Sequence, residues 1–137
     1  MKNALKAFGL IALIAVCGFS MAACGGKSSS GIYDTWADKD GNTFTFRGST
    51  GTIGNINKGS GWGAVLNTGW INNGQEVFRN IDRLTDSQWT ATHYTYVGGT
   101  YTNLVWSRCT LTLSANKQTL TVYCQDISKK FDLTRKN

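Results

Sequence analysis

The sequence predicts an all-β domain, a single antiparallel up-and-down barrel of about eight or nine strands, with a β-sandwich as the alternative. Short runs of alternating apolar and polar residues, rich in threonine and aromatic side chains, are typical of strands. Turn-forming pairs such as Gly48-Ser49 and Asn73-Gly74 separate these runs at short spacing. No extended helical periodicity follows residue 23. Sequential hairpins of this kind close most naturally into a barrel.

The first 23 residues have the pattern of an export signal. Lys2 and Lys6 are followed by an uncharged apolar run at 7–19, which is shorter than the about 20 residues that a membrane-spanning helix needs. The run leads to Met-Ala-Ala-Cys at 21–24, which resembles the lipobox of bacterial lipoproteins. The resemblance implies that residues 1–23 are removed and that Cys24 is diacylated. An uncleaved N-terminal anchor is the alternative, and both place the following domain in the cell envelope.

The lipobox resemblance also implies how the rest of the chain is organised. Residues 25–30 are small and polar, so 24–30 is expected to be a lipidated cysteine with a flexible tether. Residues 31–137 then form one domain, because too few remain for a second core. No acidic residue follows Cys24 directly, and the expected location is the outer membrane of a diderm bacterium, on its periplasmic or surface face. Membrane lipid is the expected partner of Cys24.

Charge gives little indication of a further partner. Without the two lysines of the signal, the basic residues fall from 14 to 12 against 8 acidic residues, which leaves a net charge of +4. No nucleic-acid-binding module accompanies these scattered basic residues, so nucleic acid is not an expected partner. A solvated tail is expected at the C-terminal basic residues, with attraction of phosphate or anionic lipid as the alternative; these residues are Lys129, Lys130, Arg135 and Lys136.

The turn signals predict strands at 31–37, 42–47, 50–57, 62–72, 75–84, 88–97, 100–113, 119–125 and 129–134. The Lys-Asp-Gly turn at 39–41 places Trp36 opposite Phe44, and the turn at 48–49 places Phe44 opposite Ile53. The Asn-Gly pair at 73–74 is the strongest hairpin signal, and it places Trp70 opposite Val77.

The Gly-Gly pair at 98–99 predicts a hairpin of 88–97 with 100–108. Its register places Ala91 opposite Trp106 and Tyr96 opposite Tyr101. Both faces of this pair then carry large apolar side chains. The sequence therefore leaves open which face lies inside the domain.

Two cysteines flank a further predicted hairpin. Alternating runs at 110–113 and 119–123 surround a turn-prone centre, and one register places Leu111 opposite Val122 and Cys109 opposite Cys124. The other two cysteines belong to the signal and to the lipid anchor. In an oxidising compartment, a disulfide between Cys109 and Cys124 is therefore expected. Two free buried thiols are the alternative.

The strand sequences also resemble those of bacterial lipocalin-like lipoproteins, which are small domains behind a lipobox. The likeness rests on Trp-Ala-Asp-Lys-Asp-Gly-Asn-Thr-Phe-Thr-Phe at 36–46, and on Leu-Thr-Leu at 111–113 with Leu-Thr-Val at 120–122. It spans roughly residues 31–133. The resemblance implies a closed barrel with an apolar cavity.

No residue set has the pattern of a catalytic or metal site. His93 is the only histidine and lies in the middle of a predicted strand, where a packed or hydrogen-bonded role is expected. The acidic residues lie mostly at predicted turns, and the Asp-Lys-Asp-Gly-Asn segment at 38–42 lacks the remaining ligands of a calcium loop. We therefore expect neither enzymatic activity nor a cofactor.

Aromatic side chains are the candidate binding residues. Some of them must form the core, and the rest are available to a ligand or partner. The candidates for a ligand site are Trp62, Trp70, Trp89, Tyr94, Tyr96 and Trp106. The favoured hypothesis is a lipid-anchored protein that binds a small apolar molecule or a glycan. A protein-interaction module, such as a hydrolase inhibitor or an adhesin, and a structural envelope lipoprotein are the alternatives.

Overall fold

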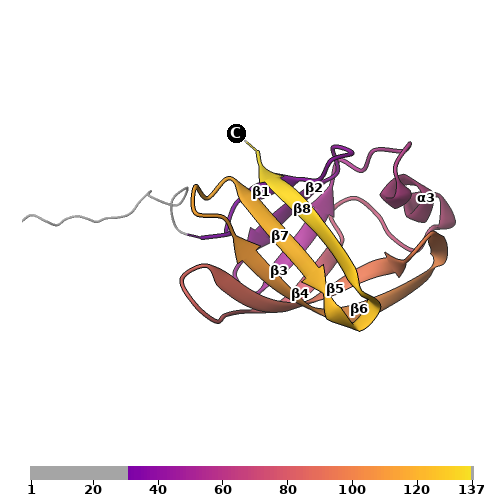
Figure 1. Cartoon of the computed structure of the whole chain (residues 1–137). Coiled ribbons are helices and arrows are strands. Elements are labelled where there is room, and N and C mark those ends of the chain that lie inside the picture. Colours follow the sequence, from indigo (N-terminus) through magenta and orange to yellow (C-terminus); the bar gives the residue numbers. More distant parts are fainter. Residues whose placement is uncertain (1–30, 137) are drawn as a thin grey trace, which may run out of the picture. The chain divides into compact units, whose positions relative to one another are not determined.

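The computed structural model describes residues 31–136, which form one closed barrel of eight antiparallel strands (Figure 1). Each strand pairs with its neighbours in sequence, and β8 returns to pair with β1. The strands are β1 (Thr35–Ala37), β2 (Thr43–Arg47), β3 (Thr50–Gly54), β4 (Glu76–Arg83), β5 (Gln88–Val97), β6 (Thr100–Leu113), β7 (Thr119–Cys124) and β8 (Lys129–Arg135). The predicted up-and-down barrel is confirmed, and the sandwich alternative is excluded. The expected signal peptide, Cys24 and the tether lie outside the described residues.

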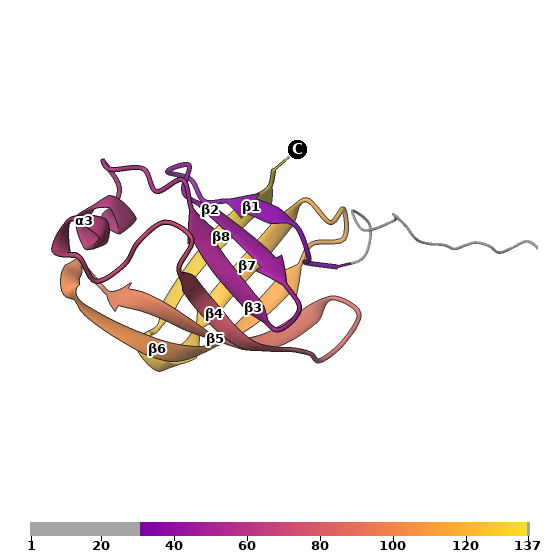
Figure 2. The same cartoon turned by 180° about the vertical axis from the view of Figure 1, so that it is seen from behind.

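The strand predicted at 62–72 is wrong, because a helix, α3 (Gly61–Thr68), stands there. The Ser60 side chain caps its first turn by accepting a hydrogen bond from the Gly63 N–H over 3.1 Å. Gly69 ends it in the left-handed region, at φ 81, where its N–H donates to the Leu66 carbonyl. Trp62 and Val65 are buried on its inner face. The helix lies beside the tip of the β5–β6 hairpin, at one end of the barrel (Figures 1 and 2).

Three of the predicted hairpin registers are confirmed. Trp36 pairs with Phe44, and Phe44 pairs with Ile53. The β6–β7 hairpin pairs Cys109 with Cys124 and carries Leu111 opposite Val122. Each of these hairpins has a short turn, which sets the register locally.

The hairpin predicted about Asn73-Gly74 is wrong. This pair instead belongs to the loop that brings the chain from α3 into β4. There the Gly74 N–H donates to the Ile53 carbonyl over 2.6 Å, and the Ile53 N–H donates to the Gln75 carbonyl over 2.9 Å. The turn therefore docks the start of β4 on β3, and no strand exists to pair Trp70 with Val77.

The register predicted for β5 and β6 holds only at the tip of the hairpin. Val97 pairs with Thr100, but Tyr96 already pairs with Leu104, so residues 101–103 bulge out of β6. The bulge shifts the register by three residues. Because side chains alternate along a strand, an odd shift reverses which side chains of β6 face inward. Ala91 consequently pairs with Cys109, and Trp106 pairs with Tyr94 on the outer face. The face of β6 that carries Cys109 and Leu111 therefore lies inside the barrel.

The two paired cysteines are free, buried thiols in the structure, so the expected disulfide is not present. The hydrogen bond that the Cys109 thiol donates to Cys124, together with burial, raises the pKa of Cys109. The register that brings the sulfur atoms together is as predicted. Register alone does not form the bond, because oxidation also requires an oxidant.

Candidate functional site

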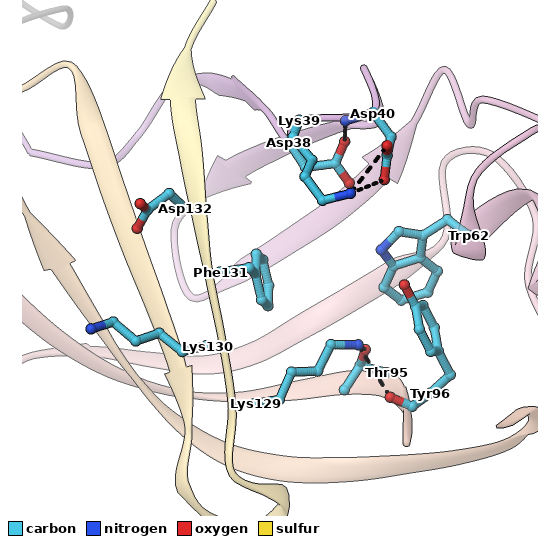
Figure 3. Close-up of a pocket in the computed structure, with 10 residues that line it drawn as sticks. All are labelled: Asp38, Lys39, Asp40, Trp62, Thr95, Tyr96, Lys129, Lys130, Phe131 and Asp132. Carbon is cyan, nitrogen blue, oxygen red and sulfur yellow. Dashed lines mark hydrogen bonds and ion pairs between the residues drawn. The ribbon is translucent and has the colours of Figure 1, made fainter. Parts of the chain in front are cut away.

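An open pocket of about 470 Å³ lies at the end of the barrel where the β1–β2 turn, α3, the end of β5 and the start of β8 come together (Figure 3). We call it the mouth pocket. Its size is in the range of about 300–1,000 Å³ that is usual for small-molecule sites. Its lining residues are Asp38, Lys39, Asp40, Trp62, Thr95, Tyr96, Lys129, Lys130, Phe131 and Asp132.

Three aromatic rings form the apolar walls of the mouth pocket. Trp62, at the start of α3, is 4% exposed and meets Tyr96 edge to face, with ring centroids 5.3 Å apart. Phe131 of β8 lies across from them, partly buried (Figure 3). The Tyr96 hydroxyl is so close to Gly61 that a Cβ there would overlap it, which is a reason for glycine at the first position of α3. The helix therefore brings Trp62 to the mouth.

His93 lies behind these rings. Its Nδ1 donates to the Val77 carbonyl over 2.8 Å, and its ring stacks on Phe78 with centroids 3.9 Å apart. The Trp62 and Phe131 rings lie 5.9 and 5.8 Å from it. Burial lowers the pKa of His93 to about 3, so the imidazole is neutral at physiological pH. Its Nε2 has no hydrogen-bond partner in the described part of the chain. The packed, hydrogen-bonded role expected for this histidine is confirmed.

The acidic residues of the β1–β2 turn, which line one side of the mouth pocket, are hydrogen-bonded or ion-paired within that turn. The Asp38 carboxylate accepts hydrogen bonds from the backbone N–H groups of Asp40 and Asn42, each over 2.9 Å, and from the Asn42 amide over 2.8 Å. Asp40 forms an ion pair with Lys39 over 3.3 Å. This segment is the plain turn that the sequence predicts. Together with burial and Tyr101, the two carboxylates raise the pKa of Tyr96.

Lys129 is the basic group of the pocket. It begins β8, and its ammonium donates to the Thr95 hydroxyl over 3.0 Å and to the Tyr96 carbonyl over 3.2 Å. The same ammonium lies 3.6 Å from the centre of the Tyr96 ring. Burial lowers the pKa of Lys129 to about 8. None of the ion pairs found within residues 31–136 includes it.

The solvated C-terminal tail that the sequence predicts is therefore wrong for two of its residues. Lys129 and Arg135 belong to β8, and both side chains face inward. Figure 3 shows Lys130 and Asp132 extending to the other side of β8. The alternation Lys-Lys-Phe-Asp-Leu at 129–133 already puts Lys129 on the face of Phe131 and Leu133, and this was the signal that could have identified it.

The six candidate aromatic residues do not form one site. Trp62 and Tyr96 meet at the mouth pocket. Tyr94 and Trp106 pack against each other on the outer wall of the barrel, with centroids 4.9 Å apart and the rings tilted by 33°. The other two are separate: Trp89 is 2% exposed in the core, and Trp70 is 56% exposed. Sequence reasoning missed Lys129, Thr95, Phe131 and the β1–β2 turn as parts of the site.

The pocket is lined by three aromatic rings and one ammonium that has no ion-pair partner among residues 31–136. Within residues 31–136, no group of histidine, cysteine and acidic side chains could hold a metal ion. No helix of that part of the chain is long and apolar enough to cross a membrane. A scan against protein-family models and searches of the curated proteins and of the solved structures returned no match.

Proposed function

We propose that the barrel binds a small apolar or ring-bearing molecule in the mouth pocket. The observation that carries the proposal is the open pocket of about 470 Å³ between the rings of Trp62, Tyr96 and Phe131. Aromatic faces bind apolar molecules by burial of area and bind glycans by stacking on the sugar ring. The polar and charged residues that line the rest of the pocket would orient such a ligand.

We further propose that this binding takes place on a membrane surface, with Cys24 as the lipid anchor. The lipobox resemblance at 21–24 supports the anchor, and the small polar residues at 25–30 support a tether. The resemblance to lipocalin-like lipoproteins supports ligand binding by the barrel. Metabolic labelling with an alkyne-bearing fatty acid, compared between the wild type and Cys24→Ala, tests the anchor.

Binding can be tested with N-phenylnaphthylamine, an uncharged aromatic probe that fluoresces in apolar sites. The lipid-free domain is expected to bind the probe, and Tyr96→Ala is expected to weaken binding by about tenfold, because one ring contact contributes up to about 1.5 kcal/mol. Tyr123→Ala is the control, since Tyr123 is a 44% exposed tyrosine of β7 that does not line the pocket.

Absence of probe binding by the wild type would contradict the proposal, and so would an equal loss of affinity in both tyrosine variants. Displacement of the probe by added sugars, rather than by apolar compounds, would identify the ligand as a glycan.

Protein binding by the outer wall is a second candidate function. Arg79 lies over Trp106, with its guanidinium carbon 3.8 Å from the ring centre, and Trp106 packs against Tyr94. Tryptophan, tyrosine and arginine are the residues most enriched at the centres of protein interfaces. Trp106→Ser is expected to abolish capture of a protein partner and to leave probe binding in the mouth pocket unchanged.

A further inference from the structure

We propose that the ligand of the mouth pocket is an amphipathic anion, with an apolar or aromatic body and one carboxylate or phosphate group that pairs with Lys129. This inference rests on the proposed function, because it assigns the chemical class of the ligand that the same pocket would bind. The rings of Trp62, Tyr96 and Phe131 would contact the body, and the ammonium would contact the anionic group.

The hydrogen bonds of Lys129 leave room for a ligand. An ammonium has three N–H donors, and those of Lys129 have two acceptors, the Thr95 hydroxyl and the Tyr96 carbonyl. These contacts hold the ammonium beside the Tyr96 ring, at the pocket wall (Figure 3). No third hydrogen-bond acceptor of this ammonium is found among residues 31–136, and an anion in the pocket would supply one.

Lys129 also has no ion-pair partner in the described part of the chain. Burying a cation without a counter-ion costs free energy, and this cost lowers its pKa. A bound carboxylate or phosphate would supply the missing counter-ion next to the apolar walls. An uncharged ligand would leave the cost in place.

The other charged groups of the pocket do not compete for this role. The Asp38 carboxylate is engaged by its own turn, and Asp40 is paired with Lys39, whose side chain is 88% exposed. Lys130 and Asp132 extend to the other side of β8 (Figure 3). Among the lining residues, Lys129 is therefore the one that would bind an anion.

Two probes that differ in one anionic group test the inference. Anilinonaphthalene sulfonate has the aromatic body of N-phenylnaphthylamine plus a sulfonate, which stands in for a carboxylate or phosphate. The wild type is expected to bind the sulfonate about tenfold more tightly, as a charge-assisted hydrogen bond provides. Lys129→Met is expected to remove this preference and to change the affinity for the uncharged probe less than about twofold. Lys136→Met makes the same charge change at an exposed residue that does not line the pocket, and it is expected to keep the preference.

The outcomes separate the inference from the proposed function. If the wild type binds both probes equally, and Lys129→Met changes neither affinity, the anion inference is overturned and the proposed function stands. If neither probe binds, both are overturned. An equal loss in Lys129→Met and Lys136→Met would also overturn the inference, since net charge would then explain the preference.

Competition identifies the anionic group once the preference is established. Decanoate, decyl phosphate and decanol each have a chain of ten carbon atoms and differ in the head group. Displacement by decanoate indicates a carboxylate ligand, and displacement by decyl phosphate indicates a phosphate of the kind found in lipid head groups. Stronger displacement by decanol than by either anion would contradict the inference.

Discussion

Arg135 of β8 lies over the indole ring of Trp36 of β1, with its guanidinium carbon 4.4 Å from the ring centroid. It also forms an ion pair with Asp34 over 2.8 Å and donates to the carbonyls of Gly31 and Lys117 over 3.0 and 2.8 Å. The first and last strands pair at only two positions, Trp36 with Arg135 and Ala37 with Thr134. These contacts therefore reinforce the seam that closes the barrel.

Arg135→Met is expected to destabilise the domain by about 3 kcal/mol or more, because it removes a buried, hydrogen-bonded charge at the seam. Arg135→Lys is expected to recover only part of this loss, since lysine lacks the planar fork that reaches several acceptors. Urea unfolding followed by tryptophan fluorescence measures both.

Lys136→Met is the matched control, because it removes an exposed charge next in sequence. A loss below about 1 kcal/mol in Arg135→Met, as is usual for a surface residue, would contradict the closing role of Arg135.

His93 predicts an acid-sensitive fold. Burial lowers the pKa of His93 to about 3 in the folded state, from 6.5. Between these values the unfolded chain binds more protons, so the free energy of unfolding falls as pH falls through this window. From pH 7 to pH 5, His93 is expected to contribute a loss of about 2 kcal/mol.

The variant His93→Phe separates this effect from the titration of carboxylates. Its ring can still stack on Phe78, but it cannot take up a proton. Denaturation at several pH values is expected to give a shallower decline for the variant than for the wild type between pH 6.5 and 4. Parallel declines would show that His93 does not cause the sensitivity.

The barrel was predictable from the sequence because short turns determine most of its strand registers. The turns at 39–41 and 48–49, and the alternating runs around 114–118, each set a register over a few residues. The bulge at 101–103 was not predictable in this way. Tyr101 packs against Tyr96, with ring centroids 5.0 Å apart, and also close to Gly61, so the bulge depends on a helix remote in sequence.

The candidate site was predictable only in part. The abundance of aromatic residues identified Trp62 and Tyr96, but not which aromatic residues would meet, because that depends on α3 and on the bulge in β6. The helix is only eight residues long, and tryptophan and valine favour strands, so its propensity signal is weak. Its caps, Ser60 and Gly69, are the stronger signal.

Ser60→Ala tests the role of the α3 cap in holding Trp62. Loss of an N-cap hydroxyl costs about 1 kcal/mol, and Ser60 also donates to the Asn57 carbonyl over 2.6 Å. The variant is expected to lower the free energy of unfolding by about that amount and to weaken N-phenylnaphthylamine binding. Ser49→Ala, in the exposed β2–β3 turn, is the control, and an equal effect there would contradict the role of the cap.

Lys129 predicts a conflict between stability and binding. Burial lowers the pKa of Lys129 to about 8 in the folded state, below its ordinary value of 10.5, so the folded state disfavours the charged form. The unfolded chain binds more protons between pH 8 and 10.5, and the contribution of Lys129 to stability therefore rises with pH over that window. Below pH 8, the full cost of the buried charge is present.

Lys129→Met removes this cost and keeps an apolar stem of similar length. At pH 7, and without ligand, the variant is expected to melt at a higher temperature than the wild type, by an amount that shrinks as pH rises toward 10.5. Lys130→Met is expected to show no such pH-dependent gain, because Lys130 is exposed on the outer face of β8. A lower melting temperature for Lys129→Met at pH 7 would mean that the contacts with Thr95 and Tyr96 outweigh the cost of burial. In that case Lys129 would be a structural residue of the barrel.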